Sequence, residues 1–137
     1  MLSVWITGAS SGIGEACAYR YAEEGARLVL TSSSVNRLEP VAARCRELGA
    51  TEVNILPFDL TCLDGIDTLT DKAWDAMKGI DIVMLNAGIS QRTNVEDTSM
   101  EMVRKIMEIN YFAPVAIAKR LLPKMVGRGY GKIAVTT

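Results

Sequence analysis

The sequence contains no histidine, and several kinds of catalytic centre are excluded with it. A serine–histidine–aspartate triad, a cysteine–histidine pair and every histidine-bearing zinc site need an imidazole ring as base or ligand. Cysteine is scarce as well, because Cys17, Cys45 and Cys62 are the only ones, and their spacing does not match that of metal ligands. We therefore expect no metal site, and we expect buried thiols in a reducing compartment.

The chain also lacks an excess of charge and a long apolar run. Its 15 lysine and arginine residues against 16 aspartate and glutamate residues give a net charge of −1. This balance does not indicate a surface for nucleic acid or anionic lipid. No apolar stretch approaches the length of a membrane span. The first one starts at Leu2, so we expect no signal peptide ahead of it. We expect a cytoplasmic protein with a small-molecule partner, and with neither nucleic acid nor membrane as a partner.

The remaining composition fits one domain over residues 1–137. Hydrophobic residues make up 49% of the chain, enough to bury a core at an ordinary domain size. Short apolar runs alternate with amphipathic segments that end at a glycine. The pattern predicts strands at 2–7, 27–31, 53–58, 80–85 and 132–137, and helices at 12–24, 38–48, 63–77 and 99–125. This alternation predicts a Rossmann-like α/β fold: a parallel sheet of about five strands, helices on both faces, and ligands at the carboxyl ends of the strands.

The most informative stretch is TGASSGIG, which begins at Thr7 and directly follows the first apolar run. A glycine turn between a strand and a helix leaves backbone N–H groups and the positive end of the helix dipole free for a phosphate or pyrophosphate. We expect Gly8 to permit the tight exit from the strand, Gly12 to let the backbone approach a ligand, and Gly14 to let the helix pack closely on the sheet. The two serines add hydroxyl donors. The alternative for this stretch alone is a plain strand-to-helix turn.

Two further strand ends carry matching signals. Asp59-Leu60 closes the third predicted strand, and Asn86-Ala87-Gly88 closes the fourth. Together with the glycine stretch, they make the whole chain resemble the short-chain dehydrogenase/reductase family, whose fingerprint Thr-Gly-x-x-x-Gly-x-Gly is matched letter for letter. The family usually carries a further asparagine where this chain has Leu85. The spacing resembles the simple oxidoreductase branch and disfavours the epimerase and dehydratase branch, which usually spaces its glycines as Gly-x-x-Gly-x-x-Gly.

The resemblance implies that a dinucleotide binds at this edge of the sheet. It implies that Asp59 binds the adenine amino group and that Leu60 packs nearby. It also implies that Asn86 braces the central strand and that Gly88 lets a ribose come close. Alone, Asp59 has a plainer interpretation as a turn former. The predicted cofactor-binding residues are Gly8, Ser10, Ser11, Gly12, Ile13, Gly14, Ser32, Ser33, Arg37, Asp59, Leu60, Asn86, Ala87 and Gly88.

The end of the second predicted strand bears on the choice of cofactor. NAD-binding members of the family usually hold the ribose with an acidic residue there, and such a carboxylate repels the 2′-phosphate of NADP. In this chain Thr31 is followed by a run of serines that ends at Ser34, with no acid, and Arg37 is the nearest cation. We therefore predict NADP as the cofactor, while NAD stays open.

Asn110 stands inside an otherwise apolar helical stretch, where its amide must find partners. Pro114 follows four residues later and has no N–H, so the carbonyl of Asn110 loses its helical donor and a kink is expected there. The resemblance implies that this carbonyl holds a water connected to the catalytic lysine, which makes Asn110 the predicted catalytic residue. The alternative is a satisfied helix asparagine beside an incidental proline.

The resemblance also implies a serine just after the fifth strand and a Tyr-x-x-x-Lys on the next helix. Neither is present, since none of the tyrosines has a lysine four residues later. We expect the cofactor-binding portion of a longer NAD(P)-dependent oxidoreductase that transfers hydride between nicotinamide and a carbonyl or alcohol substrate. It is expected to be inactive alone and a homo-oligomer, a dimer or tetramer, at full length. The alternative from another class is a non-catalytic dinucleotide-binding or regulatory module.

Overall fold

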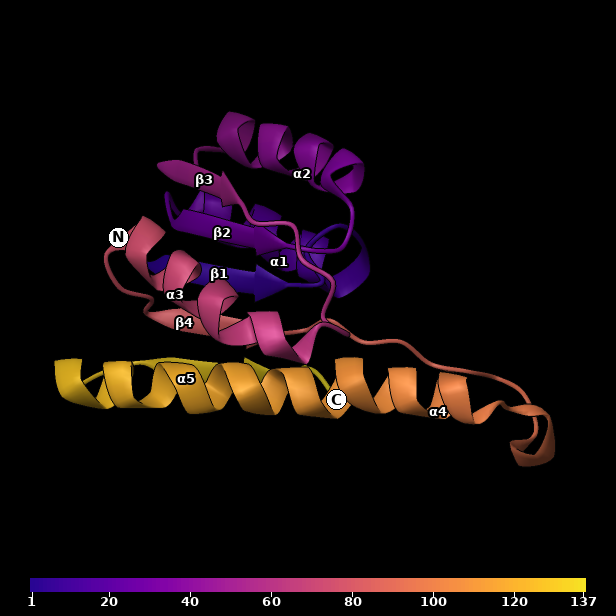
Figure 1. Cartoon of the computed structure of the whole chain (residues 1–137). Coiled ribbons are helices and arrows are strands. Elements are labelled where there is room, and N and C mark those ends of the chain that lie inside the picture. Colours follow the sequence, from indigo (N-terminus) through magenta and orange to yellow (C-terminus); the bar gives the residue numbers. More distant parts are fainter.

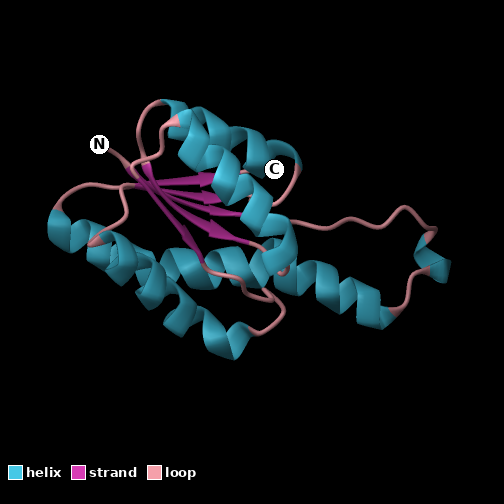
Figure 2. Cartoon of the chain, turned by 90° about the horizontal axis from the view of Figure 1, so that it is seen from above, coloured by secondary structure: helices cyan, strands magenta, loops and turns pink.

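The computed structural model describes residues 1–137, and a sheet of five parallel strands lies at its centre. The strands are β1 (Ser3–Thr7), β2 (Arg27–Thr31), β3 (Glu52–Ile55), β4 (Ile82–Leu85) and β5 (Lys132–Val135). Their order across the sheet is β3-β2-β1-β4-β5, and Figure 2 shows them side by side between two layers of helices. The predicted Rossmann-like fold is confirmed.

The chain changes direction across the sheet between β3 and β4. It moves outward from β1 through β2 to β3, and then returns to place β4 against the other edge of β1. The carboxyl ends are level, because Thr7 of β1 pairs with Thr31 of β2, and Ile6 pairs with Met84 of β4. In open parallel sheets a ligand binds outside these ends, at the point where the strand order reverses.

Helices cover both faces of the sheet because side chains alternate along each strand. Val4 and Ile6 belong to the core on one face, whereas Trp5 between them belongs to the core on the other face. The strands therefore read as continuous apolar runs, and every residue of β1 is buried. The covering helices are α1 (Gly12–Glu23) and α2 (Val35–Leu48) on the first face, and α3 (Ile66–Met77) and α5 (Ala113–Arg128) on the second (Figure 1).

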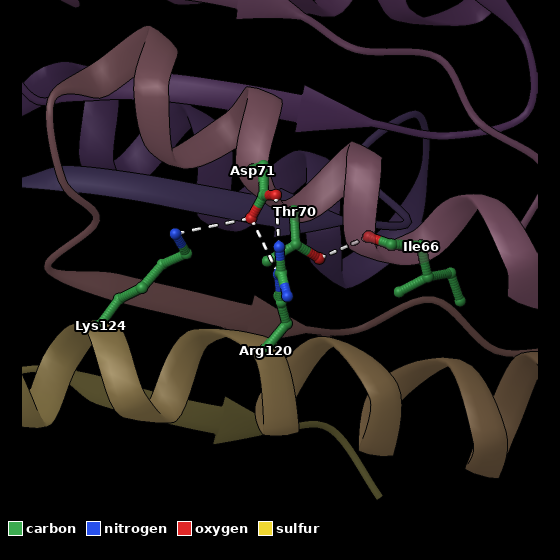
Figure 3. Close-up of polar contacts among 5 residues, drawn as sticks. All are labelled: Ile66, Thr70, Asp71, Arg120 and Lys124. Carbon is green, nitrogen blue, oxygen red and sulfur yellow. Dashed lines mark hydrogen bonds and ion pairs between the residues drawn. The ribbon is translucent and has the colours of Figure 1, made fainter.

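Helices α3 and α5 are also joined by charges at their surface. Arg120 donates from Nε and Nη2 to the two carboxylate oxygens of Asp71, at 3.0 and 2.7 Å, and Lys124 lies 3.5 Å from the same carboxylate (Figure 3). Next to Asp71, Thr70 donates its hydroxyl to the carbonyl of Ile66 at 2.7 Å and is satisfied within its own helix. The hydrogen bonds from Arg120 hold the pKa of Asp71 below its usual value.

The helix expected over 99–125 is divided by a π turn. α4 (Met100–Met107) leads into the π-helical residues Glu108–Phe112, where Ala113 donates its N–H to the carbonyl of Glu108, and α5 follows. Pro114 has no N–H for the carbonyl of Asn110, so regular α-helical bonding fails at the predicted place. The two helices nevertheless follow each other end to end, and α4 projects beyond the sheet (Figure 1).

The other element boundaries differ from the expectation by a few residues. β3 ends at Ile55, just before Pro57, and β5 ends at Val135. α2 begins before the expected residue 38, because Ser34 caps it by accepting the N–H of Arg37 at 3.3 Å. Short 3₁₀ turns occupy Leu63–Gly65 and Val95–Asp97. No helix has both the length and the apolar character that crossing a bilayer requires.

Candidate functional site

A cavity of about 890 Å³ opens at the carboxyl ends of β1, β2, β3 and β4. Its walls come from the turn after β1, from the loops that follow the next three of these strands, from one face of α4 with the start of the π turn, and from Thr136 just after β5. This is the place where a parallel sheet of this topology binds its ligand. The site is therefore built from segments that are far apart in the sequence.

The turn after β1 presents its backbone to the cavity. Gly8 and Gly12 have φ angles of +65° and +54°, in the left-handed region that favours glycine. Around Gly12 there is open space, since no atom lies within 4 Å of the place where its Cβ would stand. α1 begins behind Ser11, whose side chain makes no capping hydrogen bond, so the first N–H groups of the helix remain available to an anion.

The same turn packs closely against the residues that follow β4. A Cβ on Gly8 would stand 2.8 Å from the Cα of Ala87. A Cβ on Gly14 would stand 2.6 Å from Nδ2 of Asn86 and would collide with the carbonyl of Gly8. Only a residue without a side chain fits at either position, and the close approach expected of Gly14 is made to the ends of β1 and β4.

Thr7 fastens the end of β1 to the end of β4. Its hydroxyl oxygen accepts the backbone N–H groups of Asn86 and Ala87, both at 3.1 Å, and donates to the carbonyl of Met84 at 3.4 Å. Asn86 in turn donates from Nδ2 to the carbonyl of Gly8 at 3.3 Å. Asn86 thus shares its expected bracing role with Thr7. The sequence analysis named Thr7 as part of the fingerprint but not as a residue of the site.

The loop after β3 supplies an acceptor. The carboxylate of Asp59 accepts the backbone N–H of Thr61 at 2.9 Å and its hydroxyl at 2.7 Å. These two bonds hold the pKa of Asp59 below its usual value, and the bond from the backbone N–H of Thr61 has the larger effect. The side chain is therefore ionised at neutral pH and can accept hydrogen bonds from a ligand. Leu60 beside it is 8% exposed and joins the core under α3 and α5.

Asn110 lies outside the lining of the cavity and acts on its wall through Ile89. Its Nδ2 donates to the carbonyl of Ile89 at 2.7 Å, and its Oδ1 accepts the N–H of Ile89 at 2.9 Å. A Cβ on Gly88 would stand 3.4 Å from the same Oδ1, so glycine relieves crowding there. The partners that the amide needs are thus main-chain groups of the loop after β4. The catalytic role of Asn110 through its own carbonyl stays a prediction.

Most predicted cofactor residues gather around the cavity, and two lie outside its lining. Gly14 is buried in the first turn of α1, and Arg37 is exposed at the first turn of α2. The predicted residues in the lining are Gly8, Ser10, Ser11, Gly12, Ile13, Ser32, Ser33, Asp59, Leu60, Asn86, Ala87 and Gly88. The lining residues that the sequence reasoning missed are Phe58, Thr61, Ile89, Glu101, Arg104, Lys105, Glu108, Ile109 and Thr136.

The largest missed group lies on α4 and on Glu108, the first residue of the π turn, and it carried a signal in the sequence. Glu101, Arg104, Lys105 and Glu108 follow the helical spacing of three, four and seven residues, which places them on one face. All are charged, in a segment whose other side chains are mostly apolar. A charged face on a helix that follows the fourth strand could have been assigned to the ligand edge of the sheet.

The fold and the cavity define a Rossmann-type α/β protein with a ligand cleft at the switch point of its sheet. A family model described as short chain dehydrogenase matches residues 3–137. The chain therefore belongs to the short-chain dehydrogenase family, and the resemblance inferred from the sequence is confirmed.

Known members of the family show the same similarity in sequence and in structure. The chain is 42% identical over 133 residues to human dehydrogenase/reductase SDR family member 7. The matched region covers 95% of this chain and 39% of that protein. It is similar to the alcohol dehydrogenase of the archaeon Thermococcus sibiricus complexed with 5-hydroxy-NADP, with 33% identity and a TM-score of 0.91 over 100% of this chain and 58% of that one. It is similar to a short-chain dehydrogenase from Sphingobium yanoikuyae in complex with NADPH, with 33% identity and a TM-score of 0.89 over 98% of this chain and 52% of that one.

The chain spans about 40% of the length of the relatives that it matches in sequence. The similarity thus covers nearly all of this chain and less than half of each of those proteins.

Proposed function

We propose that this chain forms the NADP-binding part of an oxidoreductase that transfers hydride between a nicotinamide cofactor and a carbonyl or alcohol substrate. The observation that carries the proposal is the open glycine turn, with Gly12 facing the cavity and unsatisfied N–H groups at the start of α1. A pyrophosphate needs such a backbone cradle. The carboxylate of Asp59 would take the adenine amino group, and the cofactor supplies the hydride when bound.

The walls of the cavity favour NADP over NAD. The end of β2 contributes Ser32 and Ser33 to the lining, and no acidic side chain is present there to repel a 2′-phosphate. The Thermococcus sibiricus and Sphingobium yanoikuyae structures contain 5-hydroxy-NADP and NADPH, and they support the same choice. NAD remains the second candidate cofactor.

The proposal extends to the cellular location and the assembly. Cys45 is buried as expected, whereas Cys17 is half-buried and Cys62 is exposed. The three free thiols support a reducing compartment, for which we propose the cytoplasm. A homo-oligomer, dimeric or tetrameric at full length, is supported by exposed apolar side chains along α4, the π turn and α5. These side chains are Met100, Val103, Met107, Tyr111, Leu122 and Val126.

Gly12→Asn tests the binding site. Asparagine tolerates a positive φ better than most residues, so the fold should persist, while the new side chain would occupy the space in front of the turn. We expect fluorescence titration with NADPH to show binding by the unsubstituted chain and none by the variant. Gly127→Asn is the matched control, because Gly127 also has open space around it but lies on α5 away from the cavity. Equal NADPH affinity in a folded Gly12→Asn variant would contradict the proposal.

A second candidate function is a non-catalytic dinucleotide-binding module. It would use the same glycine turn and cavity without a Tyr-x-x-x-Lys pair. A panel of ketones and aldehydes with NADPH, followed by absorbance, separates the two. We expect no turnover by this chain and turnover by a version extended through a downstream Ser and Tyr-x-x-x-Lys. Binding without activity in the extended form would favour the module.

A further inference from the structure

A second cavity, of about 410 Å³, lies between α3 and the segment that follows β3. The segment contributes Leu56, Pro57 and Phe58 to its lining, and α3 contributes Leu69, so most of the wall is apolar. Small-molecule sites typically occupy about 300–1,000 Å³ and combine apolar walls with a few polar groups. The second cavity therefore has the size and the walls of such a site.

Phe58 separates the second cavity from the larger cavity at the carboxyl ends of the strands, because it is the one residue that lines both. Its ring lies directly over Gly65, where a Cβ would stand 2.9 Å from Cε2 and Cζ of the ring. The backbone N–H of Phe58 donates to the carbonyl of Ser32 at 2.9 Å, which holds the residue beside the end of β2. A ligand in the second cavity would thus touch one wall of the larger cavity without entering it.

The polar side chains of the second cavity come from one face of α3. Thr68 and Lys72 are four residues apart, so they lie on the same side of the helix, and both are exposed. Lys72 is the only charged residue in the lining, and it forms no ion pair. The aspartates of α3 lie outside the lining, and Asp71 is engaged by Arg120 and Lys124. The cavity consequently offers one cation and one hydroxyl beside apolar walls.

This combination suits a monoanion that carries an apolar tail. A carboxylate places one negative charge beside an ammonium and accepts a hydrogen bond from a hydroxyl. A phosphate dianion has more acceptors than Lys72 and Thr68 can serve, and Lys72 would repel a cation. We propose that the second cavity binds a medium-chain fatty carboxylate, with the head group beside Lys72 and Thr68 and the chain against Leu56 and Leu69. The site goes beyond the proposed function, because it is separate from the glycine turn.

NMR titration of the 137-residue chain with octanoate tests the site. We expect the amide signals of Thr68, Leu69 and Lys72 to shift, both without NADPH and at saturating NADPH, because the two cavities are separate. Octylammonium has the same chain with the opposite charge and should bind at least about threefold more weakly. Butanoate should also bind more weakly than octanoate, since each methylene that is fully buried contributes about fourfold in affinity.

Lys72→Met removes the charge and keeps an unbranched side chain on the exposed surface of α3, so the fold should persist. Octanoate affinity should fall by about threefold, the effect of one exposed ion pair, and the preference over octylammonium should disappear. Lys72→Arg keeps the charge and should keep the preference. Lys119→Met is the matched control, because Lys119 is exposed on α5 outside the cavity and carries the same charge. It should leave both affinities unchanged.

Each other outcome has a distinct meaning. Equal affinities for octanoate and octylammonium in the unsubstituted chain would overturn the inference, and so would an unchanged octanoate affinity in Lys72→Met. Shifts confined to the turn after β1 would place octanoate in the larger cavity, which overturns it as well. A chain that binds NADPH and no octanoate overturns the inference and leaves the proposed function intact. A chain that binds octanoate at Lys72 and no NADPH contradicts the proposed function and supports this inference.

Discussion

Asn86 donates a hydrogen bond from Nδ2 to the carbonyl of Gly8 at 3.3 Å and so joins two strand ends that are 78 residues apart in the sequence. The backbone N–H of Asn86 is held at the same time by the hydroxyl of Thr7 at 3.1 Å. The end of β4 therefore fixes the position of the glycine turn. Changes at the contact between these segments should alter both folding and ligand binding.

Gly14→Val is expected to damage both properties together. A side chain at Gly14 would meet the carbonyl of Gly8 and Nδ2 of Asn86, both parts of the closely packed junction. Overpacking of this kind typically costs about 1–3 kcal/mol of unfolding free energy. Urea denaturation should show the loss, and calorimetry should show no NADPH binding by the folded fraction. Gly127→Val, at an exposed position with open space around it, should keep wild-type NADPH binding.

Ser32→Asp should change the preference between cofactors. The hydroxyl of Ser32 accepts the N–H of Ser34 at 3.2 Å, and an aspartate can take over that turn-forming bond. Its carboxylate would face the cavity and repel a 2′-phosphate, so NADPH affinity should fall by about tenfold or more, equal to about 1.4 kcal/mol, while NADH affinity should not fall. Ser32→Asn keeps the bond without the charge and should show no such selectivity. A Ser32→Asp variant with unchanged NADPH affinity would contradict the cofactor assignment.

Asn110→Ala should loosen the loop after β4. The N–H of Ile89 would lose its acceptor on Asn110, and the carbonyl of Ile89 would lose its donor. We expect hydrogen exchange at the Ile89 amide to accelerate by about tenfold, the effect of losing a hydrogen bond worth about 1.4 kcal/mol. Asn36→Ala on the exposed surface of α2 serves as control. Unchanged exchange at Ile89 would mean that other contacts hold this loop.

The contact between α3 and α5 should make part of the stability depend on pH. The bonds from Arg120 lower the pKa of Asp71 in the folded state. The stabilising contribution of this ion pair to the free energy of unfolding is therefore complete above the unfolded-state pKa of about 3.9. It is lost as the pH falls through the folded-state pKa. The urea midpoint of Asp71→Asn should therefore lie below that of wild type at pH 7, and the gap should narrow at about pH 3. Asp75→Asn, on the same helix but without an ion pair, should show no such gap.

The sequence predicts the fold and the strand-end part of the site because both depend on local signals. Apolar runs place the strands, and each strand end that carries Gly8, Asp59 or Asn86 must reach one edge of a parallel sheet. Arg37 shows the limit of this reasoning. It lies close to the end of β2 in the sequence, but α2 has already begun there, and a helix directs successive side chains to different sides.

The charged face of α4 can be recognised from its helical spacing, but the sequence does not show the direction in which that face points. Lys105 and Glu108 fall within the helix predicted over 99–125, for which a kink was expected at Asn110 but no direction for the part before it. The helix changes its bonding before Ala113, and the direction of α4 depends on that change. The partner of Asn110, the main chain of Ile89, lies 21 residues away and is likewise fixed only by the folded sheet.

The π turn acts as a spacer that keeps two faces of one long helix in line. The side chains that line the cavity, and after them the side chains that pack on the sheet, are spaced three or four residues apart. The one exception is a step of five residues across the π turn. They are Glu101, Lys105, Glu108, Ala113, Ile117, Leu121 and Met125. A regular helix of the same length would rotate α4 by about 100° relative to α5, the turn that one residue makes. Either the cavity wall or the core contact would then face the wrong way. Pro114 therefore helps to keep the cavity-lining face of α4 in line with the core-facing side of α5. Any insertion or deletion in residues 108–112 has to preserve both of these orientations at once.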